Sequence, residues 1–60
     1  MEGGMTPLRQ ARKELKENGY VLKRHGANHD IYFNAMKRKA IPLKRHDFSE
    51  NDLNYIRKEM

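Results

Sequence analysis

A histidine follows a short run of turn-forming residues near the middle of this 60-residue chain. The run begins at Gly26 and ends at Asn28, His29 comes next, and Lys23 and Arg24 stand just before it. Glycine and asparagine favour tight turns, so we expect Gly26 and Asn28 to shape a turn that presents His29 at the mouth of a hairpin. An imidazole with an ordinary pKa near ~6.5 exchanges protons at neutral pH. A histidine at a strand end is more often structural than catalytic, so its basic surroundings are what favour a catalytic role.

Positive charge is concentrated in the same part of the chain. The chain has 13 Lys and Arg residues against 8 Asp and Glu residues, a net charge of +5, and residues 23–46 contain seven of the cations but a single acid. Such clustering favours a nucleic-acid partner, although basic residues also serve solubility alone. The cations that we predict to contact the nucleic acid are Lys23, Arg24, Lys37, Lys39 and Arg45.

Five predicted elements must position this histidine. The pattern of apolar and turn-forming residues predicts a helix over residues 7–18, strands over residues 20–24, 29–34 and 39–43, and a second helix that begins near residue 49. Thr6 and Pro7 form a helix start, and Gly19 supplies a helix end. Ser49 and Asp52 stand at the spacing of a capping box.

These elements predict an α+β fold in which both helices lie on one face of a three-stranded antiparallel sheet. Pro42 makes the third strand an edge strand, because proline donates no hydrogen bond. We interpret residues 1–5 as a leader or disordered N-terminus and residues 6–60 as a single domain. No apolar run is long enough for a membrane span. The absence of cysteine fits a reducing cytoplasm.

The aromatic residues of the second strand have two possible roles. Tyr32 and Phe33 could stack on nucleobases, but alternation sends one of them into the core, and we expect Phe33 to be the buried one. The same alternation places His29 on the side of Ile31 and Phe33. His29 is therefore either supported by the apolar rim of the site or simply buried at the strand end.

Several segments together resemble the HicA family of toxins. These are an amphipathic helix that ends in Asn18-Gly19-Tyr20, a Gly-x-x-His turn from Gly26 to His29 that runs into Asp30-Ile31-Tyr32, a proline-then-histidine element from Pro42 to His46, and a closing helix. The chain departs from the family in having Ala27 where serine is common after the turn glycine, in a wider spacing from proline to histidine, and in a shorter second helix.

The resemblance implies a ribonuclease of a toxin-antitoxin system that cuts messenger RNA and has a fold like that of double-stranded-RNA-binding domains. It implies that His29 is the active-site histidine and that Gly26 shapes its turn. It also implies a protein partner, a HicB-type antitoxin that covers His29 and holds the toxin inactive.

RNA cleavage by this route needs little chemical machinery. RNA carries its own nucleophile, the 2′-hydroxyl, so His29 would act as general base while nearby cations stabilise the phosphorane. His25, His46 or water would protonate the leaving group, and the sequence leaves all three open. The three histidines and Asp30 lack the regular spacing of a zinc motif, so we expect no metal and no cofactor.

Two other classes of function fit the same residues. A non-catalytic RNA- or DNA-binding module would hold its ligand through a basic sheet without cutting it. An interaction protein would use the basic face to dock an acidic partner, and this role is compatible with a toxin held by an antitoxin.

Overall fold

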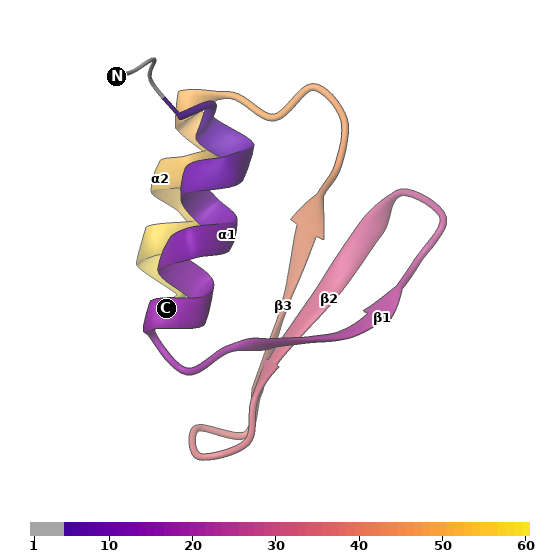
Figure 1. Cartoon of the computed structure of the whole chain (residues 1–60), viewed down its shortest axis with the longest axis vertical. Coiled ribbons are helices and arrows are strands. Elements are labelled where there is room, and N and C mark those ends of the chain that lie inside the picture. Colours follow the sequence, from indigo (N-terminus) through magenta and orange to yellow (C-terminus); the bar gives the residue numbers. More distant parts are fainter. Residues whose placement is uncertain (1–4) are drawn as a thin grey trace.

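The structure, a computed structural model, describes residues 5–60. The expected leader at residues 1–5 lies outside the described residues except for Met5, which is exposed. The element order is α1 (Pro7–Glu17), β1 (Val21–His25), β2 (His29–Asn34), β3 (Lys39–Lys44) and α2 (Glu50–Glu59). The two helices contact each other and lie together beside the sheet (Figure 1). The predicted α+β class and element order are confirmed.

Both helices begin at the residues that the sequence indicates. The Thr6 hydroxyl accepts a hydrogen bond from the Arg9 N–H at 3.3 Å, and Gly19, at φ +87°, ends the first helical segment. At α2 the Ser49 N–H donates to the Asp52 carboxylate at 2.9 Å, and the Asp52 N–H donates back to the Ser49 hydroxyl at 3.4 Å, which completes the capping box. Neither described helix is long and apolar enough to cross a membrane.

The sheet is antiparallel with the strand order β1-β2-β3, so β3 is an edge strand as Pro42 indicated. The register of β2 and β3 pairs His29 with Lys44 at one end of the two strands and Asn34 with Lys39 at the other. Residues paired in this way share a face of the sheet. Lys44 is therefore the cross-strand neighbour of His29.

The two faces of the sheet differ sharply in burial. In β2 the even-numbered residues are buried and the odd-numbered residues are exposed or half-buried. Tyr32 is 6% exposed and belongs to the core, whereas Phe33 is half-buried on the opposite face. The expectation that Phe33 is the core residue was therefore wrong, although His29 does share its face. We call this side the open face; its members in β2 and β3 are His29, Ile31, Phe33, Ala40, Pro42 and Lys44.

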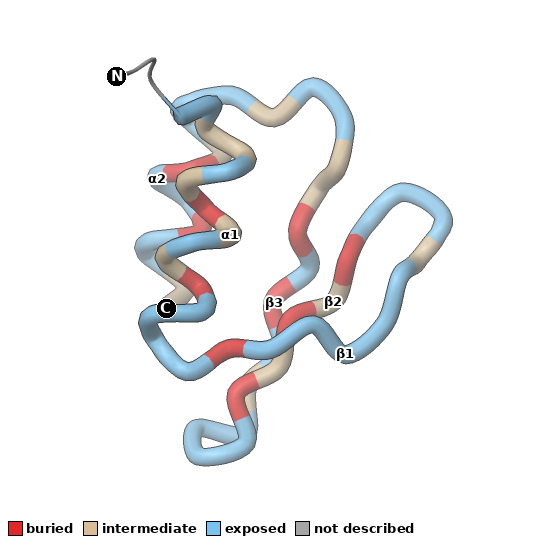
Figure 2. The backbone as a smooth tube through the Cα atoms, viewed as in Figure 1, coloured by how far each residue is buried: buried red, intermediate tan, exposed pale blue. Residues whose placement is uncertain are grey.

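The core lies on the other side of the sheet, where both helices pack. Its buried apolar residues come from both helices, from β2 and β3 and from the segment after α1 (Figure 2). They are Ala11, Leu15, Tyr20, Tyr32, Ile41, Leu43, Leu53 and Ile56. Leu8, Phe48 and Met60 pack against this cluster from its edges. Apolar burial on one face leaves the open face available for a ligand.

A polar contact fixes the helices to each other. Arg57 of α2 donates two hydrogen bonds to the Glu14 carboxylate of α1, at 2.8 Å and 2.7 Å, and Gln10 donates a third at 2.7 Å. The hydrogen bonds from Arg57, followed by the one from Gln10, lower the pKa of Glu14 to about 2. The pair stays ionised throughout the physiological pH range and orients α2 on α1.

Candidate nucleic-acid interface and catalytic histidine

His29 is the first residue of β2 and is exposed on the open face. It emerges directly from the turn that the sequence predicted at residues 26–28. The Gly26 N–H donates a hydrogen bond to the His29 carbonyl at 2.7 Å, and a Cβ atom at position 26 would lie 2.7 Å from that same oxygen. Only glycine fits without a shift of the backbone, so Gly26 shapes the turn through close approach.

Asn28 holds the turn from its other side. Its carbonyl accepts a hydrogen bond from the Arg45 N–H at 3.2 Å, which continues the contact between β2 and β3 past the last residue of β3. The backbone of His29 is thus fixed by Gly26 before it and by the β3 end beside it. A backbone held at both ends keeps an exposed side chain in a defined position.

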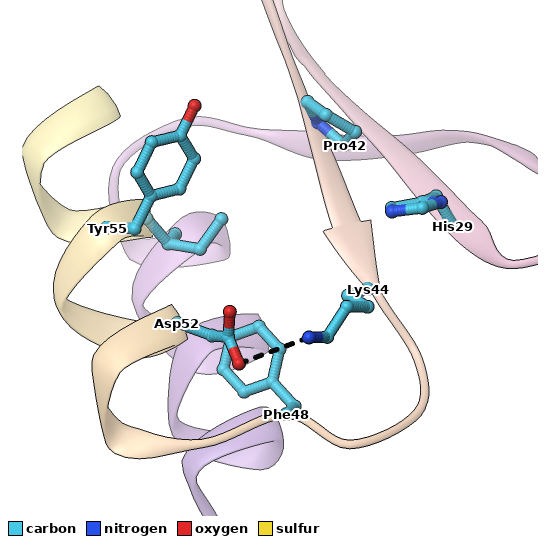
Figure 3. Close-up of a pocket in the computed structure, with 7 residues that line it drawn as sticks. His29, Pro42, Lys44, Phe48, Asp52 and Tyr55 are labelled. Atoms are coloured by element: carbon cyan, nitrogen blue, oxygen red, sulfur yellow. Dashed lines mark ion pairs between the residues drawn. The ribbon is translucent and has the colours of Figure 1, made fainter.

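The His29 ring lines a cavity of about 170 Å³. The cavity lies where α2 runs past β3, with Pro42 and His29 of the sheet on one side and Tyr55 of α2 on the other (Figure 3). Phe48 and Ile56 add apolar surface, and the charged side chains at the cavity are Lys44 and Asp52. The site therefore combines a proton-exchanging group, a cation and an aromatic wall.

Lys44 is held across this cavity by an ion pair. Its Nζ atom lies 3.4 Å from the Asp52 carboxylate, and both side chains are more than one-third exposed at 41% and 34%. The backbone hydrogen bond from Ser49 is the main cause that lowers the pKa of Asp52, and Lys44 lowers it further. An exposed pair of this kind contributes little to stability, so Lys44 could exchange Asp52 for another anion at low cost.

Two of the predicted RNA-binding cations lie on the open face with His29. Lys23 sits at a bulge in β1 and places its Nζ atom 4.6 Å from the centre of the Phe33 ring. Arg24 pairs with Ile31 and so points to the same face. Together with Lys44 they make the open face positively charged around its apolar side chains, which are Ile31, Phe33, Ala40 and Pro42.

His25 and Arg45 are instead engaged by a buried carboxylate on the core side. Asp30 is 2% exposed, and its Oδ1 atom lies 2.7 Å from His25 Nδ1 and 2.7 Å from Arg45 Nη1. Arg45 also donates to the Ala27 carbonyl at 2.6 Å, and Arg12 of α1 approaches Asp30 Oδ2 at 3.6 Å. The structure therefore does not bring His25 or the Arg45 guanidinium to the face that carries His29.

Burial of Asp30 raises the pKa of its carboxyl, but the hydrogen bonds with His25 and Arg45 outweigh burial. The net effect holds the pKa of Asp30 below its usual range. Asp30 is thus a charged anchor that ties the turn, the end of β3 and α1 together.

Lys37 and Lys39 lie at the opposite end of β2 and β3 from His29, five strand residues or roughly 17 Å away. Lys37 donates to the Met60 carbonyl at 2.9 Å and Lys39 donates to the Glu59 carbonyl, so both satisfy the last turn of α2. His46 is exposed in the segment between β3 and α2. The predicted cations therefore do not form one cluster around His29.

Sequence reasoning missed Lys44, Asp52 and Tyr55 as members of the site. A signal for Lys44 was available, because a four-residue turn after Asn34 sets the register that pairs position 44 with His29. The contributions of α2 had no such signal, since they depend on how the helix packs beside β3. Within residues 5–60, no three His, Asp or Glu side chains gather as they would around a metal ion.

Comparison of the chain with models of protein families, with curated proteins and with solved structures finds no significant match. The HicA resemblance therefore rests on the residues and spacings quoted for it, and the family assignment stays a prediction.

The buried Asp30 predicts a pH-dependent stability. A carboxyl with a lowered pKa in the folded state stabilises the fold above the usual pKa of Asp, near ~3.9, and this contribution is lost as the pH falls through the folded-state pKa. We expect Asp30→Asn to reduce the free energy of unfolding at pH 7 by about 1–3 kcal/mol, because it removes the buried negative charge that Arg45 and Arg12 face. Urea unfolding at pH 7 and at acidic pH measures the difference.

The matched control is Asp47→Asn. Asp47 is exposed at φ +55°, a backbone conformation that asparagine also adopts, so this change should leave stability nearly unaltered. The gap between wild type and Asp30→Asn should shrink at acidic pH. Equal stability of the two proteins at pH 7, or a gap that does not depend on pH, would contradict the anchoring role of Asp30.

Proposed function

We propose that this chain is a metal-independent endoribonuclease that cleaves messenger RNA, with His29 as the general base. The observation that carries the proposal is the position of His29: it is exposed on a basic face, at a cavity, with Lys44 as its cross-strand neighbour. The HicA resemblance supports the same role for His29 and adds the toxin component of a toxin-antitoxin system as its biological setting.

The reaction uses groups that RNA and these side chains already contain. Neutral His29 accepts the proton of a 2′-hydroxyl, and the 2′-oxygen attacks the adjacent phosphorus. The bond from phosphorus to the 5′-oxygen breaks, and that oxygen takes up a proton. The products are a 2′,3′-cyclic phosphate and a free 5′-hydroxyl. Lys44 stabilises the charge that develops on the phosphoryl oxygens.

The position of His25 reduces the number of candidate groups that could protonate the leaving 5′-oxygen. Because His25 is bound to Asp30 on the core side, it stands on the wrong face to reach a phosphate at His29. His46, which is exposed two residues after Lys44, and water are the remaining donors. Lys23 and Arg24 hold flanking phosphates on the open face, so binding depends strongly on salt concentration.

A non-catalytic RNA- or DNA-binding module is the second candidate function. The position of His25 favours it, since that position leaves His29 with fewer possible acid partners than the sequence allowed. This function also requires the basic open face but predicts that a bound nucleic acid stays intact.

A protein partner follows from the proposed activity. A nuclease that degrades messenger RNA in the cytoplasm has to be inhibited in the cell that makes it, and covering His29 is the most direct way to inhibit it. We propose a HicB-type antitoxin with an acidic surface that complements the open face.

Substitution of His29 tests the catalytic assignment. We expect His29→Ala to lose cleavage of a long single-stranded RNA by about 10²–10⁴-fold, the usual contribution of general base catalysis. Cleavage is measured in EDTA, with both proteins shown to be folded and to bind the RNA equally well. Cleavage by wild type that EDTA abolishes would contradict a metal-independent reaction.

His25→Gln is the matched control, because it removes a histidine from the core side and keeps a hydrogen-bond donor near Asp30. This variant should cleave at nearly the wild-type rate. Equal cleavage by wild type and His29→Ala would remove His29 as the base, and binding without cleavage by every variant would favour the binding module.

Expression beside its genomic neighbours tests the partner. We expect the chain to copurify with a protein encoded next to it, and this protein should stop cleavage while shielding the His29 ring from solvent in an NMR titration. A chain that copurifies with no neighbouring gene product would count against the antitoxin.

A further inference from the structure

The cavity beside His29 contains more apolar and aromatic surface than proton transfer requires. Tyr55 projects from α2 on one side of it, and Pro42 lies on the sheet side (Figure 3). Tyr55 is 57% exposed, so much of its side chain is available to a ligand. Nothing in the core explains its position, since the buried residues of α2 are Leu53 and Ile56.

The size of the cavity matches a flat ring. A cavity of ~150 Å³ lined by apolar side chains accepts one benzene-sized molecule, and the cavity here measures about 170 Å³. It therefore has room for the six-membered ring of one nucleobase. Phe48 and Ile56 supply the apolar lining that such a ring requires.

The charge around the cavity matches the rest of a nucleotide. Lys44 stands at the cavity with its side chain 41% exposed, and its partner Asp52 binds it only through an exposed ion pair. A ligand with a flat apolar ring and a flanking phosphate would meet both Tyr55 and Lys44. Beyond the cavity, Lys23 and Arg24 extend the positive charge over the open face.

We infer that this cavity is a subsite for one unpaired nucleobase of single-stranded RNA, which stacks on Tyr55 while the adjacent phosphate lies at Lys44 and His29. The identity of the ligand as RNA rests on the proposed function, but the subsite itself is a binding property that does not require cleavage. A base inside a duplex cannot enter a cavity, so the subsite selects single strands.

The test measures affinity for RNA that cannot be cut. The probe is a short single-stranded RNA with 2′-O-methyl groups and uracil at each position, and its partner probe has the same backbone without bases. Binding of both is followed by fluorescence anisotropy at one fixed salt concentration. The variants are Tyr55→Ala, Tyr55→Leu and Tyr55→Phe. Because position 55 is exposed, we expect all three variants to fold normally.

We expect Tyr55→Ala to weaken binding of the uracil-containing probe by roughly 5- to 150-fold, the range that corresponds to loss of one stacked base. Tyr55→Phe should bind like wild type because it keeps the ring, and Tyr55→Leu should fall between the two. None of the variants should change binding of the probe without bases, since its contacts are with cations alone.

Two results would overturn the subsite. One is wild-type affinity of Tyr55→Ala for the uracil-containing probe. The other is an equal loss of affinity for both probes, which would assign Tyr55 to the fold or to a protein partner. Cleavage of unmodified RNA is measured separately. Base-dependent binding without cleavage would keep the subsite and contradict the nuclease, whereas cleavage by a protein whose binding does not depend on the bases would keep the nuclease and contradict the subsite.

Discussion

The buried carboxylate of Asp30 is the contact on which the site depends. It gathers His25 from β1, Arg45 from the end of β3 and Arg12 from α1, at 2.7 Å, 2.7 Å and 3.6 Å. Arg45 in turn holds the Ala27 carbonyl and, through its backbone N–H, the Asn28 carbonyl. These bonds clamp the turn from which His29 emerges. A buried charge with several partners is costly to disturb, so the turn has one well-defined position.

The same contact separates the histidines by role. Asp30 and His29 are neighbours in β2 and therefore point to opposite faces of the sheet. His25 and the Arg45 guanidinium are engaged on the core side, and Lys37 and Lys39 are engaged at the end of α2. What remains on the open face is a smaller set of groups around His29. The basic charge of the chain is thus divided between holding the fold and facing a ligand.

Much of the fold could be predicted from short sequence patterns, whereas the candidate site could be predicted only in part. Helix starts, the Gly19 helix end and the Gly26 turn are fixed by neighbouring residues, so the sequence located them. The alternation of side chains along β2 placed His29 on the same face of the sheet as Phe33, but it did not determine which of the two faces is buried. That choice depends on tertiary packing of Tyr32 and on partners for Asp30, which come from three separate elements. The position of Tyr55 likewise depends on how α2 packs beside β3.

The central claim is that His29 acts on the 2′-hydroxyl of RNA, and the chemistry of the cut ends tests it most directly. The measurement is mass spectrometry of the fragments released from a defined single-stranded RNA by the purified protein in EDTA. Our account predicts fragments that end in a 2′,3′-cyclic phosphate and begin with a 5′-hydroxyl. Fragments with a 3′-hydroxyl and a 5′-phosphate would contradict it, because water rather than the 2′-hydroxyl would then be the nucleophile.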